Sequence, residues 1–293
     1  MATPPINSGL MASSRTSQET LPVTNHPQKR SWLSTLRDDV HLAHTDLPVL
    51  ATCVVSGLCD SVAFNAIGVF VSMQTGNTIF LALGAASLPA NQPNLWYRAF
   101  VSIAAFWAGC YFFGQFRRFR PQSKLTLSLS FLIQAIFIFI AASLAQSRQS
   151  PSFGLSRLPT TLDSVQEDAR EELENMAMSL VPLAMLAFQF GGQIVTSRVL
   201  GVNEVPTNVL TSLYCDLLSD PGLFAPLKRN LKRNRRVASI CLLVGGGVAG
   251  GWLQRSRAGM SAALWIAGGI KVVISAIWLL WRSREVDAQG SKA

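Results

Sequence analysis

Residues 56–77 of this 293-residue chain read Ser-Gly-Leu-Cys-Asp-Ser-Val-Ala-Phe-Asn-Ala-Ile-Gly-Val-Phe-Val-Ser-Met-Gln-Thr-Gly-Asn. They lie inside a longer run, residues 47–97, in which Asp60 is the only charged side chain. A run of this length is enough to cross a bilayer core of ~30 Å twice, because a helix rises ~1.5 Å per residue. The stretch therefore predicts two membrane segments, with a carboxylate at membrane depth.

Asp60 is the residue of this stretch whose position needs a physical reason. An ionisable side chain at membrane depth costs about 2.5–3.5 kcal/mol on insertion scales, so it is expected to face the protein interior or a wet cavity. Gly57, Gly68 and Gly76 allow close helix packing and also allow a helix to break. We expect the stretch to pack against other helices rather than against lipid.

The motifs Gly57-Leu-Cys-Asp60 and Val69-Phe-Val-Ser-Met-Gln-Thr-Gly-Asn77 carry a resemblance. They are similar to the signature of the YoaK-type family, multi-pass membrane proteins whose domain has no known function, and fungal members are the most similar. The resemblance extends over about residues 45–283, and its sharpest motif is Thr75-Gly76-Asn77. It implies a membrane architecture and no established activity.

Composition supports a membrane protein. Hydrophobic residues make up 49% of the chain and charged residues only 14%, against about a quarter in soluble domains. The formal net charge is +9, and the basic residues cluster between apolar segments, as the retention of Lys and Arg on the cytoplasmic side predicts. Nucleic-acid binding is the weaker interpretation of this charge.

The apolar segments predict an all-α polytopic membrane bundle of six to eight spans, with eight favoured. The eight segments are expected at about residues 47–65, 68–87, 99–116, 125–145, 176–197, 205–218, 237–253 and 260–281. Residues 205–218 are short and polar, and we include them because they align with residues 68–87. A short interfacial or solvated helix is expected between Ser31 and Asp46.

The second half of the chain resembles a copy of the first. The residues that recur at an offset of 137 are Arg98, Ser102, Ile103, Gly109 and Gly114, which return as Arg235, Ser239, Ile240, Gly246 and Gly251. Thr211 follows Thr75 by 136, Lys271 falls at the position of Gln134, and Gln193 lies near that of Asp60. Chance recurrence of small residues in membrane helices is the alternative. We favour two tandem repeats because one offset relates successive segments.

These patterns divide the chain into five parts. They are a cytoplasmic disordered tail with the short helix (1–46), a first membrane half (47–146), a polar cytoplasmic linker (147–175), a second membrane half (176–282) and a C-terminal tail (283–293). An even number of spans in each half would give both halves the same orientation, with their polar segments near a pseudo-twofold axis. With eight spans, 17 of the 25 Lys and Arg lie on the cytoplasmic side, and the cluster at residues 117–124 is an exception.

A set of polar residues at membrane depth forms the candidate solute or proton site: Asp60, Thr75, Gly76, Asn77, Gln193, Thr211 and Lys271. Asp60 would exchange protons or bind a cation, and Lys271 is a possible partner for it. A fixed Asp60–Lys271 ion pair and a helix-capping Asp60 are the structural alternatives. Thr75, Gly76 and Asn77 would serve either solute binding or close helix packing.

No catalytic residues are predicted, and the chain is not expected to be an enzyme. Gly57-Leu-Cys-Asp60 is similar to the Gly-x-Gly-Asp of intramembrane aspartyl proteases, but Cys59 replaces the second glycine and no Tyr-Asp motif accompanies it. All three histidines precede residue 47, so the membrane region offers no histidine as a catalytic base or a metal ligand. We predict no metal site and no cofactor.

The sequence favours a secondary transporter of a small polar or anionic solute, because each half places an interrupted, Gly- and Thr-rich segment at membrane depth. The alternative is a non-transporting membrane scaffold or regulator that acts through the acidic linker and the basic run at residues 228–236. The expected partners are the lipid bilayer and a small solute, without nucleic acid. The oligomeric state stays open, and we favour the plasma membrane as the location.

Overall fold

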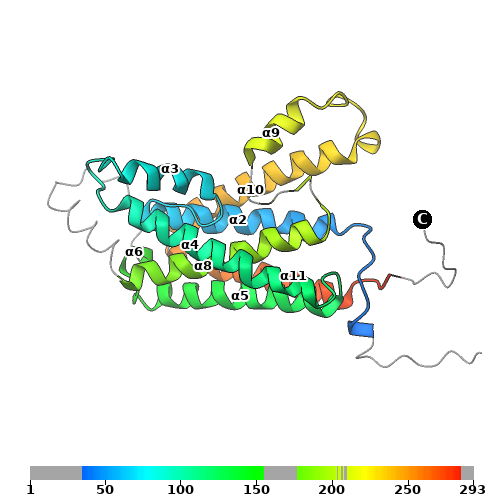
Figure 1. Cartoon of the computed structure of the whole chain (residues 1–293), viewed down its shortest axis with the longest axis horizontal. Helices are drawn as coiled ribbons and strands as arrows, with labels where there is room; N and C mark the ends of the chain where they lie inside the picture. The colour runs from blue at the N-terminus through cyan, green and yellow to red at the C-terminus, as the bar shows by residue number, and fades with distance from the viewer. Residues whose placement is uncertain (1–34, 155–176, 203, 206, 208–209, 285–293) are drawn as a thin grey trace, which may run out of the picture. The chain divides into compact units, whose positions relative to one another are not determined.

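The computed structural model describes residues 35–154, 177–202, 204–205, 207 and 210–284 (Figure 1). In this part of the chain all regular elements are helical, which confirms the all-α prediction. Helices long and apolar enough to cross a membrane are α2 (Asp46–Ile67), α4 (Leu95–Gly114), α5 (Lys124–Gln146), α8 (Ala177–Val199), α10 (Leu231–Arg255) and α11 (Gly259–Leu280). The described residues thus form a six-span membrane bundle.

The helix ends follow from local chemistry. Helix α2 stops at Gly68, which takes the left-handed conformation (φ 75°) and donates its N–H to the Phe64 carbonyl at 2.9 Å. The Ser123 hydroxyl caps α5 by accepting the Thr126 N–H, and the Asn230 side chain caps α10 by accepting the Arg233 N–H. The turns between spans therefore have sequence-encoded boundaries.

Helix α2 is the most enclosed of the six spans. In its apolar stretch 72% of the residues are buried, against 28% for α4 and α10. It packs against α10 and α11, while α8 packs against α4 and α5, and α5 also packs closely on α11. The helix that carries Asp60 is thus surrounded by protein, as the cost of a carboxylate in lipid requires.

Two pairs of helices touch through glycines, and the two contacts are alike. A Cβ built on Gly57 of α2 would lie 2.1 Å from the Leu243 carbonyl oxygen of α10, and one on Gly246 would lie 2.4 Å from that of Val54. In the other pair, a Cβ on Gly109 of α4 would lie 2.0 Å from the Phe188 carbonyl oxygen of α8. A Cβ on Gly191 would lie 2.4 Å from the Cys110 nitrogen. Backbones this close leave no room for a side chain.

These contacts correspond between the two halves of the sequence. Gly246 follows Gly109 by 137 residues, and Gly191 follows Gly57 by 134. Each of these contacts joins one helix of the first predicted half to one of the second: α2 with α10, and α4 with α8.

The two polar segments that an eight-span count requires do not cross the membrane. Residues 68–87 form a non-helical stretch and the short helix α3 (Gln74–Gly84), and the end of residues 205–218 forms α9 (Leu210–Leu218). At ~1.5 Å per residue, helices of 11 and 9 residues reach about 16 and 14 Å, roughly half of a bilayer core. The favoured count of eight spans was therefore too high, and the lower end of the predicted range is correct.

The number of spans decides the orientation of the two predicted halves relative to each other. Three of the six spans fall in each of the two predicted halves, and an odd number gives tandem copies opposite orientations in the membrane. The common orientation was expected for an even number of spans in each half, and six spans do not meet that condition. The polar helices do not meet on an axis either: α3 packs against α4 and α9 against α10 (Figure 1).

The segments that flank the membrane bundle meet at one end of it, which we call the basic end. The Trp281 indole N–H donates to the His41 carbonyl at 2.9 Å, and the Val40 N–H donates to the Gln122 carbonyl at 2.9 Å. Residues 39 and 40 form bridges to residues 123 and 283, and Val40 is fully buried. The helix predicted up to Asp46 is therefore wrong over residues 37–45, because pairing with these two segments replaces it.

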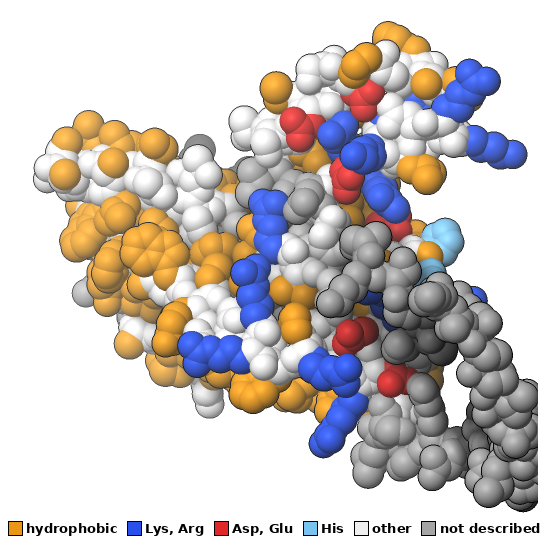
Figure 2. Space-filling model, turned by 45° about the vertical axis from the view of Figure 1, so that its right-hand side comes forward, with side chains coloured by type: hydrophobic (Ala, Val, Ile, Leu, Met, Phe, Trp, Pro, Cys, Tyr) orange, Lys and Arg blue, Asp and Glu red, His pale blue; other side chains and the backbone are white. Residues whose placement is uncertain are grey.

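The basic run at residues 228–236 belongs to the same end, since Arg235 pairs with Asp46 at 3.0 Å. Arg236 pairs with Asp220 at 3.1 Å and Lys232 with Glu204 at 3.6 Å. The Gly222 N–H and the Asn230 amide also donate to Asp220 and hold the pKa of its carboxyl below the usual range. Figure 2 shows charged side chains gathered toward one end of the molecule and hydrophobic side chains covering the other side of the visible face.

The predicted disordered tail at residues 1–30 and most of the predicted linker at 147–175 lie outside the described residues. Of the linker, residues 147–154 are described and include the short helix α6 (Pro151–Gly154). The C-terminal tail is described only as far as Arg284. The predicted roles of these parts stay predictions.

The six-span topology predicts a labelling pattern that eight spans exclude. Cysteines placed at Arg118 and at Lys228, in a cysteine-free background, should react with a membrane-impermeant maleimide from the same face, while one at Arg257 should react from the other. Eight spans would separate Arg118 from Lys228, because a spanning segment at 205–218 would reverse the chain once more between them. If Arg118→Cys and Arg257→Cys reacted from the same face of the membrane, the result would contradict the six-span fold.

The glycine contacts predict matched losses of stability. Gly57→Ala and Gly191→Ala should both lower the melting temperature of the detergent-solubilised protein, because the new methyl group overlaps backbone atoms of the facing helix. Gly245→Ala is the control, since nothing lies within 4 Å of a Cβ there. Thermal unfolding followed by tryptophan fluorescence measures all three. Equal melting temperatures for the variants and the wild type would contradict the close contacts.

Candidate functional site

The chain re-enters the bundle after α2. Beyond Gly68 it turns back, and the N–H groups of Val71 and Ser72 donate to Asp60 Oδ1 at 2.9 Å each. The Ser72 hydroxyl donates to Asp60 Oδ2. Asp60 lies seven residues before the end of α2, so residues 68–73, the re-entrant segment, return by roughly 10 Å along that helix.

Further side chains satisfy the backbone of the re-entrant segment. The Asn77 amide donates to the Phe70 carbonyl at 2.7 Å and accepts its N–H at 3.0 Å, and the Ser102 hydroxyl donates to the same carbonyl at 2.7 Å. Arg98, fully buried, donates to the Ile67 carbonyl at 3.0 Å. A non-helical backbone at membrane depth needs such partners, because lipid offers none. Asp60, Asn77, Ser102 and Arg98 supply them here.

This geometry differs from the helix-capping alternative for Asp60, because its carboxylate holds the non-helical backbone before α3 and α3 itself has no side-chain cap. Both carboxylate oxygens are engaged by the re-entrant segment, and Asp60 is 4% exposed. Among the described residues no ion pair joins Asp60 to Lys271, and the two side chains share no hydrogen-bond partner. The ion-pair alternative is thus not seen in this part of the chain, and each residue belongs to a polar cluster of its own.

Lys271 is the centre of the second cluster, which we call the core cluster. It has no exposed surface, and its Nζ donates to Gln134 Oε1 and to Gln193 Oε1, both at 2.6 Å. The rings of Phe131 and Phe190 lie 5.1 and 5.9 Å from Nζ, within the range of cation–π attraction. Neutral amides and aromatic faces thus surround this amine, in place of the carboxylate that usually accompanies a buried lysine.

The core cluster lies where the two halves meet. Gln134 on α5 and Lys271 on α11 are 137 residues apart, the offset that relates the halves, and they bond to each other. Gln193 adds α8 and extends the cluster to α2, because its amide donates to the Ser56 hydroxyl at 2.9 Å. Four spans, two from each half, therefore converge on one amine.

Gln189 lies one helical turn before Gln193 on α8, and so on the same side of that helix. It is fully buried, and neither atom of its amide has a hydrogen-bond partner among the described residues. An unpaired buried amide costs about 1–3 kcal/mol. Gln189 is therefore available to a polar molecule that reaches the interior.

The structure divides the predicted site residues into three groups. Asp60 and Asn77 hold the re-entrant segment, and Gln193 and Lys271 form the core cluster. Thr75 and Thr211 are exposed on α3 and α9, and Gly76 packs against the Phe70 ring. The predicted residues thus do not form one site.

Sequence reasoning missed Gln134, Ser72 and Ser102 as members of the two clusters. The signal for Gln134 was present, since it occupies the position that Lys271 occupies in the second half. No comparable signal marks Ser72 or Ser102, because serine is common in membrane helices and usually bonds to its own backbone.

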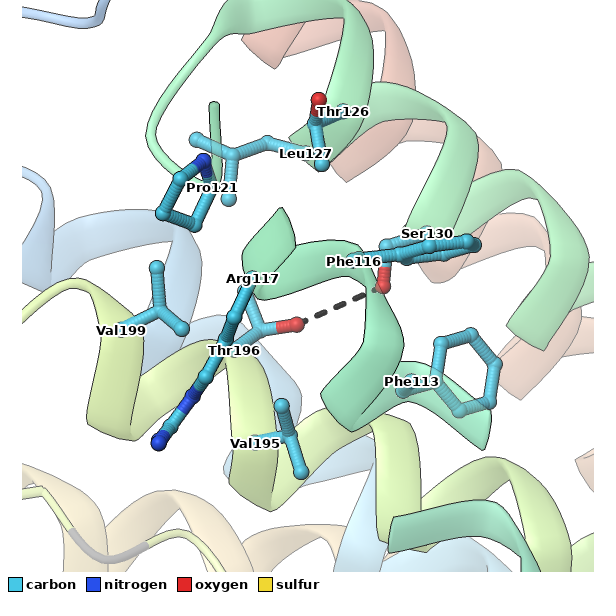
Figure 3. Close-up of a pocket in the computed structure, with 10 residues that line it drawn as sticks. All are labelled: Phe113, Phe116, Arg117, Pro121, Thr126, Leu127, Ser130, Val195, Thr196 and Val199. Carbon is cyan, nitrogen blue, oxygen red and sulfur yellow. Dashed lines mark hydrogen bonds between the residues drawn. The ribbon is translucent and has the colours of Figure 1, made fainter. Parts of the chain in front are cut away.

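A pocket opens at the basic end, between the ends of α4 and α8 and the start of α5 (Figure 3). Its enclosed volume is about 20 Å³, and its empty space reaches about 250 Å³ when the open mouth is included. Its walls are mostly apolar, from Phe113, Phe116, Leu127, Val195 and Val199, and Arg117 lies at its edge. Ser130 and Thr196 also line it and lie 3.4 Å apart through their hydroxyl oxygens.

The donor set does not suit a metal ion. Among the described residues, no three His, Cys, Asp or Glu side chains come together in a group able to hold one. The groups that converge at the core cluster are an amine and side-chain amides, whose N–H groups suit an anion or a neutral polar solute better than a cation.

Six apolar spans around a polar core define an integral, multi-pass membrane protein. The family model of DUF1275, described as a protein of unknown function, matches residues 49–277. The match covers most of the chain, from the start of α2 almost to the end of α11, and the protein belongs to this family. No curated protein and no solved structure gives a significant match.

The two clusters predict independent mutational effects. Asp60→Ala should destabilise the protein by about 2–6 kcal/mol, because it leaves two buried backbone N–H groups without an acceptor at about 1–3 kcal/mol each. Asp60→Asn keeps one carbonyl oxygen and should cost less. Adding Lys271→Met should change the stability of either variant by the same amount as it changes the wild type. Chemical or thermal unfolding in detergent measures the stability of the single and double mutants. If Lys271→Met restored the stability lost in Asp60→Asn, the result would support an Asp60–Lys271 ion pair instead of two independent clusters.

Proposed function

We propose that the protein is a secondary transporter of a small anion, and that Lys271 is the positive charge that binds it. The observation that carries the proposal is the composition of the core cluster. A fully buried amine stands at the meeting point of both halves with only neutral partners around it.

The free energy of the buried amine supports a functional role. Placing an ammonium group in a low-dielectric interior costs several kcal/mol unless an opposite charge offsets the loss of water. Two amide oxygens and two aromatic rings offset only part of this cost. An anion would supply the missing charge, and the unpaired Gln189 amide would supply a further N–H donor for it.

The relation between the halves also favours transport. Inverted repeats with interrupted segments at matching positions are typical of secondary transporters, in which rocking of the repeats exposes a central site to each side in turn. Here the re-entrant segment with α3 corresponds to the segment before α9, and the core cluster lies between the halves. The enclosed Lys271 corresponds to the occluded state of such a cycle.

The same topology orients the protein in its membrane. On six spans the basic end carries 18 of the 25 Lys and Arg, and six lie at the other end. The positive-inside rule then places the basic end and both tails in the cytoplasm, and the cluster at residues 117–124 ceases to be an exception. The linker at 147–175 falls on the opposite side, in place of the cytoplasmic side that eight spans required.

We further infer that the chain is a YoaK-type member of its family, on the strength of the Thr75-Gly76-Asn77 motif. This relationship supplies no substrate. Asn77 braces the re-entrant segment, so the motif supports the architecture on which transport depends rather than the binding of the solute itself.

The proposal is tested by flux through purified protein in liposomes. Wild-type protein should take up at least one small anion from a panel of carboxylates, phosphate, sulfate and chloride, and Lys271→Met should lower that uptake by at least ten-fold. Arg257→Gln is the charge control, because this exposed residue at the opposite end should leave uptake within two-fold. Protein that moves no anion or neutral solute while binding a specific protein partner would favour the scaffold alternative.

A further inference from the structure

The pocket at the basic end combines one cation with apolar walls. Arg117 at its edge is exposed and makes no hydrogen bond or ion pair with the described residues. The remaining wall is formed by aromatic and aliphatic side chains, among them Phe116 and Val199 (Figure 3). A guanidinium group binds a carboxylate through two parallel N–H donors, and an apolar wall favours a hydrocarbon group next to it.

The floor of this pocket is linked to the core cluster. Thr196 donates its hydroxyl proton to the Gly192 carbonyl at 2.9 Å, so Ser130 is the donor in the 3.4 Å contact between the two hydroxyls. The Gln134 amide donates to Ser130 at 3.1 Å, and its carbonyl oxygen accepts from Lys271 at 2.6 Å. Two hydrogen bonds therefore connect the pocket floor to Lys271.

We propose that this pocket is the cytoplasmic access site of the transporter, and that its ligand is a short-chain monocarboxylate. This inference rests on the proposed transport function and names the class of its substrate. Arg117 holds the carboxylate at the mouth, and the alkyl group lies against Phe116, Leu127 and Val199. Ser130 and Gln134 then lead toward Lys271, the second cation on the path.

Charge and size favour a monocarboxylate over other anions. The pocket and the core cluster each present a single cation, which matches one negative charge, whereas a divalent sulfate or phosphate would keep an uncompensated charge among apolar walls. The enclosed volume is only about 20 Å³, room for one methyl-sized group, and the rest of the empty space of about 250 Å³ belongs to the open mouth. A short alkyl chain therefore fits and a long one does not. Chloride would leave the apolar walls without a partner.

Equilibrium binding tests the pocket separately from transport. We would measure binding of ¹⁴C-labelled propionate to the full-length protein in nanodiscs, with unlabelled butyrate, sulfate and phosphate as competitors. Arg117→Gln should weaken propionate binding by at least ten-fold, while Arg118→Gln, an exposed neighbour outside the pocket, should stay within two-fold. Val199→Phe, which fills the pocket without changing its charge, should also abolish binding. Butyrate should compete, and sulfate and phosphate should not.

The outcomes separate this inference from the transport proposal. Absent propionate binding, equal effects of Arg117→Gln and Arg118→Gln, or competition by sulfate as strong as by butyrate would each overturn the pocket assignment. Anion uptake that requires Lys271 but is unchanged by Arg117→Gln and Val199→Phe would also overturn the pocket assignment. The transport proposal would then still stand. Propionate binding that requires Arg117 in a protein without any flux would keep the pocket and reject transport.

Discussion

The structure depends on one constraint: a backbone that leaves its helix at membrane depth must find hydrogen-bond partners within the protein. Helix α2 ends at Gly68, and the chain turns back into the bundle for six residues. Asp60 receives two of the N–H groups in this stretch, and Asn77 both donates to and accepts from Phe70. Without these side chains, the cost of the unpaired groups would exceed the few kcal/mol by which membrane helices insert. A residue that is costly at membrane depth is thus also one that makes the interruption of the helix possible.

Glycine contacts decide which helices pack against each other. Because lipid is as apolar as a leucine side chain, membrane helices associate through close packing, and the α2–α10 and α4–α8 pairs approach until backbone meets backbone. The pairing exchanges helices between the halves and brings α5 against α11. That placement joins Gln134 to Lys271 and leaves the amine enclosed on all sides. The core cluster is therefore a consequence of helix packing, although its chemistry is unrelated to packing.

The two polar clusters differ in how completely their polar and charged groups are paired. Around Asp60 both carboxylate oxygens accept hydrogen bonds and the Phe70 backbone groups are paired with Asn77, which is the pattern of a structural network. Around Lys271 the charge balance is incomplete, and the neighbouring Gln189 amide has no partner among the described residues. Groups left unsatisfied at a cost in stability are where a ligand is expected to contribute, and this difference is the reason to look for function at Lys271 rather than at Asp60.

The sequence by itself determined the helical class, the six long apolar segments and the inward position of Asp60, because segment length and the cost of a charge in lipid are local quantities. The sequence also relates Gly109 to Gly246 by the offset of 137 residues, although it did not predict that both lie at close helix contacts. Only the tertiary structure decided that residues 68–87 re-enter rather than cross, since the hydropathy of this run is the same whether it forms one spanning helix or a re-entrant segment followed by a short helix. It likewise decided the partners of Asp60 and Lys271: the re-entrant segment brings N–H groups to the carboxylate, whereas α5 and α8 bring amide oxygens to the amine. Which of two buried charges meets which partner depends on helix packing, and no local property of the chain encodes it.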